Sequence, residues 1–218
     1  MKKNNNLKFW FDHFQCDKSS SHSYFVEYEK CFDSFTNNID LLEIGIFKGA
    51  SSRAFINCYG NLNYYGIDIF ERENLNVVSD ILNHERFKCL VADSTRNTIV
   101  DTINREWPDV SFDVIIDDGS HLHRDMMNTF KYLYPFLREG GTYYIEDFFP
   151  LTFEGLLFNN RQLKGEREYF LDRPDDFNEK TYYGLFSTIK GFKPSAVEHI
   201  DLRVNDNRTD SYIIKITK

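Results

Sequence analysis

The stretch IDLLEIGIFKGASSRAFINCY, residues 39–59, decides the fold of this 218-residue chain. Residues 39–45 contain the apolar run that predicts a strand buried on both faces. The turn that follows carries Gly45 and Gly49, and glycine lets a ligand approach the backbone closely. Residues 51–59 then predict a helix that Ser51 caps. A buried strand, a glycine-containing turn and a helix in this order indicate an α/β fold.

The same alternation of short apolar runs and amphipathic segments continues to residue 148. Four more strands are predicted, over residues 63–70, 86–93, 112–117 and 142–148. Helices are predicted over residues 76–85 and 95–107, and a further helix before the stop EGG (139–141) has one apolar face: Met127, Phe130, Leu133, Tyr134 and Leu137. Strands that alternate with helices imply right-handed crossovers and a parallel sheet covered on both faces.

The two ends of the chain depart from this alternation. Residues 1–38 look helical and aromatic, and we expect them to form a cap segment ahead of a domain over residues 39–218. The runs AVEHIDLRV (196–204) and SYIIKIT (211–217) are separated by a turn-rich stretch, which predicts an antiparallel hairpin on the sheet edge. The predicted fold class is therefore α/β, with a doubly wound, mostly parallel seven-stranded sheet.

Composition and charge limit the classes of function. Apolar residues make up 41% and charged residues 28%, as in soluble globular proteins, and the formal net charge is -8. This acidity argues against nucleic-acid binding, because phosphate contacts need clustered Lys and Arg. The sequence has neither an apolar run long enough for a membrane span nor a signal-peptide pattern. The cysteines are scattered, which argues against a zinc site and against disulfides and is typical of a cytoplasmic protein: Cys16, Cys31, Cys58 and Cys89.

Each of the five predicted parallel strands ends in or next to an acid. In open α/β sheets, ligands bind beyond the carboxyl ends of the strands. The acids at these ends are Glu43, Asp68, Asp93, Asp117, Asp118, Glu146 and Asp147. A carboxylate after the second strand can accept the hydroxyls of a ribose, one after the third can accept from an adenine amine, and one near the first or fourth can pair with an ammonium. Because acids would repel a pyrophosphate, a positively charged nucleoside fits better than a dinucleotide.

Five ordered segments resemble the motifs of class I S-adenosylmethionine-dependent methyltransferases: LLEIGIFKGASS, YYGIDIF, CLVADST, FDVIIDDGSH and GGTYYIEDF. Within that group, IIDDGSH followed by YYIED is similar to the metal-dependent sugar O-methyltransferases of the mycinamicin and macrocin type. Residues 17–32, DKSSSHSYFVEYEKCF, are similar to the segment that precedes the domain in those enzymes. The resemblance implies a Rossmann-like fold, S-adenosylmethionine and Mg²⁺ as cofactors, and as acceptor a hydroxyl of a sugar or glycosylated small molecule, either a natural product or a surface glycan.

The resemblance also implies contacts with S-adenosylmethionine. Gly45 would lie against the methionine part, Asp68 would hold the ribose, Asp93 would lie near the adenine with Ser94 beside it, and Asp117 would lie near the methionyl amino end. Glu43 and Ser51 complete the set expected around the cofactor. Lys18, His22 and Tyr24 would close over its tail; the alternative is that this segment only begins a packing helix. After residue 147 the sequence departs from the macrolide enzymes, which leaves the substrate open.

Acids at two adjacent strand ends predict a metal site. The fourth and fifth strands should be neighbours about 4.8 Å apart, which brings Asp118 next to Glu146 and Asp147. Three hard oxygen donors suit Mg²⁺, and without a cation the three carboxylates would repel one another. The alternative is that Asp118 or Ser120 caps the following helix.

His121 is the predicted general base. It lies three residues after Asp118, near the expected start of a helix, where a neutral imidazole can take a proton from a hydroxyl. Asp118 or Asp117 is the competing base. His123 should point away from His121 on that helix.

Residues 150–195 are the predicted substrate lid, because they carry many aromatic side chains that can stack on a sugar. The alternative is helical packing on the sheet or a subunit contact, so the oligomeric state stays open, a homo-oligomer included.

Three other functions stay open. A catechol or polyphenol O-methyltransferase would use the same metal and adjacent hydroxyls. A nucleoside-binding module without catalysis would not need the acids and His121. An aminopropyltransferase would use the fold without a metal, so sensitivity to EDTA separates it.

Overall fold

The computed structural model describes residues 6–148 and 192–218. Seven strands form one sheet in the order β3-β2-β1-β4-β5-β7-β6. The strands are β1 (Ile39–Ile44), β2 (Leu62–Asp68), β3 (Phe87–Val91), β4 (Phe112–Asp117), β5 (Leu137–Ile145), β6 (Ala196–Asp201) and β7 (Tyr212–Thr217). β1 to β5 pair in parallel, whereas β7 is antiparallel to both β5 and β6. The predicted seven-stranded sheet with its C-terminal hairpin is therefore confirmed.

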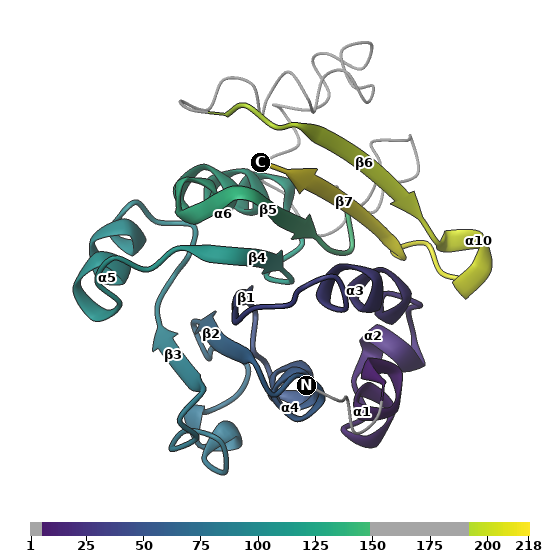
Figure 1. Cartoon of the computed structure of the whole chain (residues 1–218), viewed down its shortest axis with the longest axis horizontal. Coiled ribbons are helices and arrows are strands. Elements are labelled where there is room, and N and C mark those ends of the chain that lie inside the picture. The colour runs from purple at the N-terminus through teal and green to yellow at the C-terminus, as the bar shows by residue number, and fades with distance from the viewer. Residues whose placement is uncertain (1–5, 149–191) are drawn as a thin grey trace.

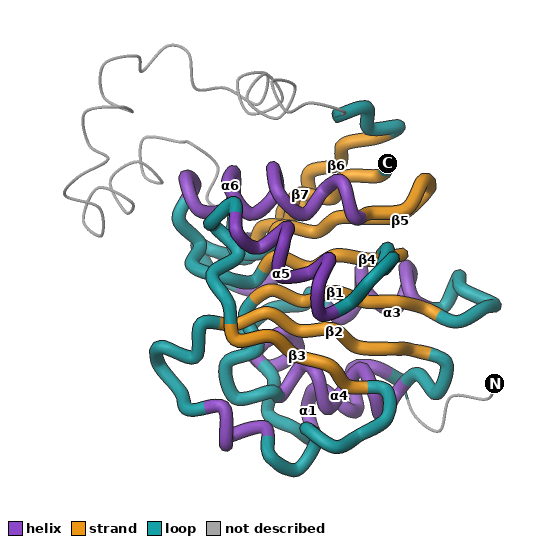
Figure 2. The backbone as a smooth tube through the Cα atoms, turned by 90° about the vertical axis from the view of Figure 1, so that its left-hand side faces the viewer, coloured by secondary structure: helices purple, strands orange, loops and turns teal. Residues whose placement is uncertain are grey.

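Helices cover both faces of this sheet. They are α1 (Leu7–His13), α2 (Asp17–Ser20), α3 (Phe25–Phe32), α4 (Ala50–Cys58), α5 (Thr98–Glu106), α6 (His123–Leu133) and α10 (Arg203–Asp206), with the 3₁₀ helices η1 (Leu75–Val78) and η2 (Tyr134–Phe136). Figure 1 shows α5 and α6 on one face and α1 to α4 on the other, and Figure 2 shows the strands stacked between these layers. Among the described residues, no helix combines the length and apolar character that a bilayer crossing needs.

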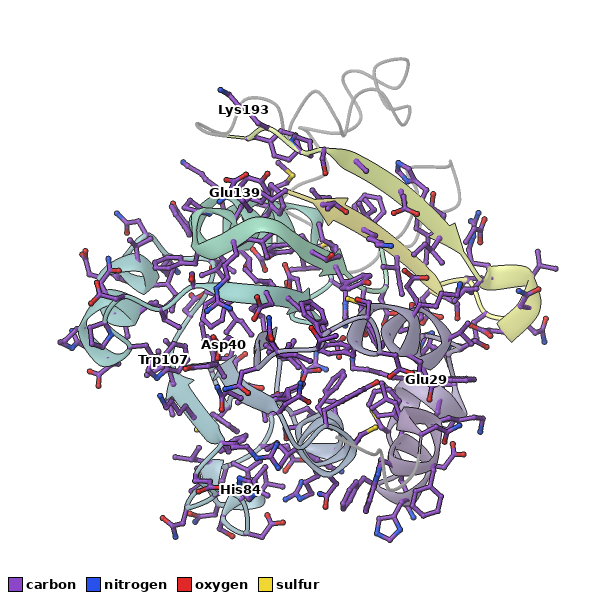
Figure 3. The ribbon with its side chains drawn as sticks, viewed as in Figure 1. Glu29, Asp40, His84, Trp107, Glu139 and Lys193 are labelled. Carbon is purple, nitrogen blue, oxygen red and sulfur yellow. The ribbon has the colours of Figure 1, made fainter. Side chains whose placement is uncertain are left out.

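Two apolar layers hold the helices to the sheet. On the cap side, Phe55 of α4 is fully buried and contacts the rings of Phe11 and Phe32, at centroid distances of 5.4 and 5.0 Å. On the other side, Trp107, labelled near α5 in Figure 3, lies edge-on to Tyr65 of β2 at 5.0 Å. Aromatic residues from distant parts of the chain thus fix the cap segment and α5 against the same sheet.

The predicted helix over residues 76–85 is wrong. The only helical residues there belong to the short 3₁₀ helix η1, which ends at Val78, and turns follow it. The Asn74 side chain accepts a hydrogen bond from the amide of Asn76. The Arg53 guanidinium donates hydrogen bonds to the Val77 carbonyl and to the Asp80 carboxylate. These side chains compete for the backbone groups that a longer helix would use.

The predicted role of Ser51 as a helix cap is also wrong. Helix α4 begins at Ala50, and its N-cap is Gly49 in the left-handed region, with φ of 72°. A side chain at Gly49 would meet Val78 and Arg53, at 2.6 and 2.8 Å from an added Cβ. Ser51 lies in the first turn, two residues after Gly49, and donates instead to Glu43.

The stretch EGG is part of a strand and not a helix stop. Helix α6 ends at Leu133, Pro135 lies in η2, and Leu137 already begins β5. The β4–β5 register shifts between Phe112 and Val114, and Gly140 has φ of 77°. A glycine in the left-handed region accommodates the extra residues of this irregularity.

Candidate active site

The carboxyl ends of β1, β4 and β5 meet because the three strands are parallel neighbours. Asp117 is in register with Ile44 of β1 and with Ile145 of β5. The residues that follow therefore leave the sheet side by side. We call Glu43, Asp118, Glu146 and Asp147 the acid cluster. The predicted adjacency of the fourth and fifth strands is confirmed.

Lys18 of α2 reaches into the acid cluster from the cap segment. Its Nζ lies 2.5 Å from Asp118 Oδ2, 2.6 Å from Glu146 Oε2 and 3.7 Å from Glu43 Oε1. The residue is 1% exposed. Burial alone would lower the pKa of Lys18, but the charges of Asp118, Glu146 and Glu43 outweigh burial and raise it. The ammonium therefore stays charged and neutralises part of the cluster.

Glu146 is held at both of its carboxylate oxygens. Oε2 accepts from Lys18, and Oε1 accepts from the hydroxyl of Tyr28 in α3. Burial, and next the charge of Asp118, raise the pKa of Glu146 well above its usual value, although Lys18 opposes the rise. The sequence reasoning missed Tyr28, although it lies four residues after Tyr24 and so on the same helix face.

Glu43 is the most enclosed acid of the cluster. Its Oε2 accepts from Ser51 Oγ at 2.7 Å and from the hydroxyl of Tyr64 at 2.5 Å. Burial raises the pKa of Glu43, and the ammonium of Lys18 counteracts the rise. Tyr64 was not predicted either, because its place in a strand gives no sign of its partner.

Asp118, His121 and Asp147 come together on the outer side of the cluster. One ligand atom from each lies within 4.8 Å of the others. His121 Nε2 is 3.6 Å from Asp118 Oδ1 and 3.8 Å from Asp147 Oδ2. His121 and Asp147 both adopt the left-handed region, with φ of 58° and 49°. Such conformations in non-glycine residues cost energy and occur often at functional sites.

His121 lies near the start of a helix, as predicted. Helix α6 begins two residues later, and its N-cap Leu122 makes no side-chain capping bond. Ser120 donates to Asp125 at 2.8 Å and accepts from the Leu122 amide at 3.3 Å. Asp118 instead bonds Lys18, so the alternative in which it caps the helix is wrong.

His22 and Tyr24 connect the cap segment to Asp147 and to the β7 end. Tyr24 donates to Asp147 Oδ1 at 2.6 Å and accepts from the Tyr212 amide at 3.1 Å. His22 Nδ1 lies 2.8 Å from Ser211 Oγ and 3.9 Å from Asp147 Oδ1. Burial raises the pKa of Asp147, while His121 lowers it. His22 and Tyr24 of the cap segment therefore line one side of the acid cluster.

Asp68 and Gly45 shape the turn after β1. Asp68 accepts from the amides of Ile46, Phe47 and Phe70, at 2.7, 2.8 and 2.6 Å. Gly45 has φ of 88°, and an added Cβ would lie 2.0 Å from the Asp118 carbonyl oxygen. Gly45 is thus required by the close approach of the β4 end, whatever else it contacts.

Asp93, Ser94 and Asp117 are the remaining predicted cofactor residues. Asp93 accepts from Thr95 and Arg96 after β3, and Ser94 lies 3.0 Å from the Thr129 hydroxyl of α6. Asp117 shares a strand face with Ile115, which packs in the α5–α6 layer. Burial raises the pKa of Asp117 to about 8. Whether these residues contact a cofactor stays a prediction.

The fold and the position of this site define a methyltransferase-type α/β domain. Residues 42–148, just under half of the chain, match the family described as "Methyltransferase domain".

Among curated proteins, the chain is 25% identical over 200 residues to mycinamicin VI 2''-O-methyltransferase of Micromonospora griseorubida, covering 88% of this chain and 44% of that protein. It is 28% identical over 145 residues to demethylmacrocin O-methyltransferase of Streptomyces fradiae, covering 62% and 34%. The chain thus matches less than half the length of these relatives.

A solved structure described as MycE methyltransferase from the mycinamycin biosynthetic pathway, in complex with Mg and SAH, has the same fold. Its TM-score is 0.71 at 20% identity, covering 100% of this chain and 55% of that one. The predicted class of fold is confirmed.

Proposed function

We propose that this protein uses S-adenosylmethionine and Mg²⁺ to methylate a hydroxyl of a sugar or of a glycosylated small molecule. The observation that carries the proposal is the meeting of Asp118, His121 and Asp147 at the ends of adjacent parallel strands. The methyltransferase domain over residues 42–148 and the likeness to curated sugar-pathway O-methyltransferases support the reaction class and the acceptor.

The ends of β1, β2 and β3 fit a nucleoside. Phe47, Ile69 and Val91 are 52%, 50% and 60% exposed there, although large apolar side chains are usually buried. An adenine ring would cover such side chains. Asp68 uses three acceptor positions on backbone amides, and a carboxylate has about four, so one remains for a ribose hydroxyl. S-adenosylmethionine would supply an electrophilic methyl group.

We propose that the methionyl end lies toward Gly45, Glu43 and Ser51. Glu43 Oε1 faces Lys18 at 3.7 Å, which is too long for a hydrogen bond, so this oxygen can accept from an ammonium. Lys18 and His22 would border the carboxylate tail, and Asp93 with Ser94 and Asp117 would border the nucleoside from the β3 and β4 ends.

The donors of the acid cluster fit a hard divalent cation. Asp118 and Asp147 offer one carboxylate oxygen each toward His121, and Glu146 lies beside them. We propose Asp118, Glu146 and Asp147 as the residues that hold Mg²⁺. The bound ion would acidify and orient an acceptor hydroxyl.

His121 would take the proton from that hydroxyl at Nε2. Its separations of 3.6 and 3.8 Å from the two carboxylates exceed hydrogen-bond length, so Nε2 is hydrogen-bonded to neither carboxylate and can accept from an acceptor hydroxyl. The buried walls of the cluster would position the hydroxyl, and positioning supplies much of the rate of such a transfer. The predicted lid over residues 150–195 lies almost wholly outside the described residues.

The test is methyl transfer from labelled S-adenosylmethionine to a panel of sugars, glycosides and catechols, with EDTA and with added Mg²⁺. We expect uptake by sugars or glycosides that EDTA abolishes and Mg²⁺ restores. Methyl uptake by catechols alone would contradict the proposed sugar acceptor but would be consistent with the proposed metal. Full activity in EDTA would contradict the metal, and binding of S-adenosylhomocysteine without any transfer would favour a non-catalytic module.

A further inference from the structure

We propose that Lys18 is a positioning residue that orients Asp118 and Glu146 for the divalent cation, an inference that rests on the proposed function. Lys18 comes from the cap segment, 100 residues before Asp118 and 128 before Glu146. Its single ammonium bonds one oxygen of each carboxylate, at 2.5 and 2.6 Å.

The ammonium divides the two oxygens of Asp118 between two tasks. Oδ2 is bound to Lys18, whereas Oδ1 is the oxygen nearest His121, at 3.6 Å from Nε2. Rotation of the carboxyl group would break the charge-assisted bond to Lys18, so that bond fixes which oxygen faces His121 and Asp147. Lys18 therefore aims Asp118 Oδ1 at the point where the three candidate donors meet.

The same ammonium keeps Glu146 in place against repulsion. Glu146 is 2% exposed, and the charges of Asp118 and Asp147 both act on it. Tyr28 holds Oε1 from the cap segment, and Lys18 holds Oε2. Without Lys18, the three carboxylates would repel one another, and Glu146 would keep the Tyr28 hydroxyl as its donor.

Two physical effects of Lys18 on a nearby cation have opposite signs. As a like charge, the ammonium repels the cation, so its removal would tighten binding. As the partner that orients the ligands, it favours the cation, and loss of such partners weakens metal affinity by about 10–100-fold. We infer that orientation dominates, because the ammonium bonds Oδ2 of Asp118 and leaves Oδ1, the oxygen nearest His121, for the cation.

The experiment is titration of the full chain with Mn²⁺, followed by the electron paramagnetic resonance of the free ion. We expect Lys18→Met to weaken Mn²⁺ binding by about 10–100-fold. The matched control is Lys215→Met, which removes a lysine paired with Glu27 and Glu198 at 3.0 and 3.1 Å, and which should bind Mn²⁺ as the wild type does. Near-ultraviolet circular dichroism reports whether each variant keeps its packed aromatic core.

The outcomes separate this inference from the proposed function. Unchanged or tighter Mn²⁺ binding by folded Lys18→Met overturns the positioning role and leaves the metal site intact. A wild-type protein that does not bind Mn²⁺ overturns the metal site and the inference with it. If Lys18→Met does not fold, the double variant Lys18→Met/Glu43→Gln removes a buried positive and a buried negative charge together. The inference predicts the same weakening there, and wild-type affinity would overturn it.

Discussion

The two ends of the sheet each hold a basic side chain between carboxylates, but they hold it in different surroundings. At the amino ends of the strands, Arg138 of β5 bonds Asp40 of β1 and Asp113 of β4, at 2.7 and 2.6 Å. Asp40 is labelled in Figure 3. The Arg138 side chain is 39% exposed, whereas Lys18 at the carboxyl ends is almost entirely enclosed.

The difference lies in charge balance as well as burial. One guanidinium meets two aspartates at the amino ends, and water screens the small excess. At the carboxyl ends one ammonium contacts three of the four acids of the cluster, and burial there makes uncompensated charge costly. A fold gains nothing from such an excess by itself. The amino end thus serves the fold, and the excess of acids at the carboxyl end fits the cationic ligand that we propose.

The largest effect should come from His121→Ala. If this imidazole is the base at the carboxyl ends, the substitution lowers turnover by roughly 10²–10⁴ and leaves S-adenosylhomocysteine binding within a few-fold. Methyl transfer and calorimetry measure the two quantities. His13→Ala, at the end of α1, is the matched control and should keep full turnover. Retained turnover in His121→Ala would move the base role to Asp118 or Asp117.

The next effect concerns the two aspartates of β4, one at each end of the strand. Burial raises the pKa of Asp117 to about 8, so the folded protein keeps this carboxyl protonated from about pH 4 to 8 while the unfolded chain ionises it. The folded state then binds the extra proton, and stability falls as pH rises through this window, by up to about 1.4 kcal/mol per pH unit.

Asp117→Asn should therefore flatten the dependence of the free energy of unfolding on pH between about 5 and 8. Denaturant titrations at several pH values measure it. Asp113→Asn, at the other end of β4, is the control and should keep the wild-type slope in this window. An unaltered slope in Asp117→Asn would show that Asp117 is ionised in the folded protein.

The fold was predictable where strand and helix periods were continuous. The five parallel strands and the C-terminal hairpin followed from apolar runs of strand length between turn signals. The predicted helix over residues 76–85 failed because the spacing of its apolar residues suited a helix, whereas hydrogen bonds from Asn74 and Arg53 hold the backbone in another conformation. The predicted helix stop at EGG (139–141) failed because glycines after a helix usually mark its end, whereas here Gly140 lies in the irregular part of β5.

The site was predictable as a set of positions and not as a set of bonds. Adjacency of parallel strands brought Asp118 next to Glu146 and Asp147 without knowledge of side-chain directions. The bonds that Lys18 and Tyr28 make to these acids join residues more than 90 positions apart. Local sequence carries no signal for such pairs, which depend on how the cap segment packs on the sheet.

Asp68→Ala should have a smaller effect, on cofactor affinity. It removes the proposed ribose acceptor and frees the amides of Ile46 and Phe47, so S-adenosylhomocysteine should bind about tenfold more weakly, equivalent to about 1.4 kcal/mol. Calorimetry measures the change. Asp80→Ala breaks an exposed pair with Arg53 and should leave the affinity unchanged. Equal affinities in both variants would remove Asp68 from the cofactor site.

The smallest effect is expected at the amino ends, from Arg138→Met. The half-exposed guanidinium pairs with Asp40 and Asp113, and exposed pairs contribute about 0–1 kcal/mol, so the free energy of unfolding should fall by no more than about 1 kcal/mol. Turnover and Mn²⁺ affinity should not change, because the whole length of the strands separates Arg138 from the acid cluster. Thermal and denaturant unfolding measure the first quantity. A loss of Mn²⁺ affinity as large as that expected for Lys18→Met would mean that both ends of the sheet respond to general loosening, and the functional contrast between them would not hold.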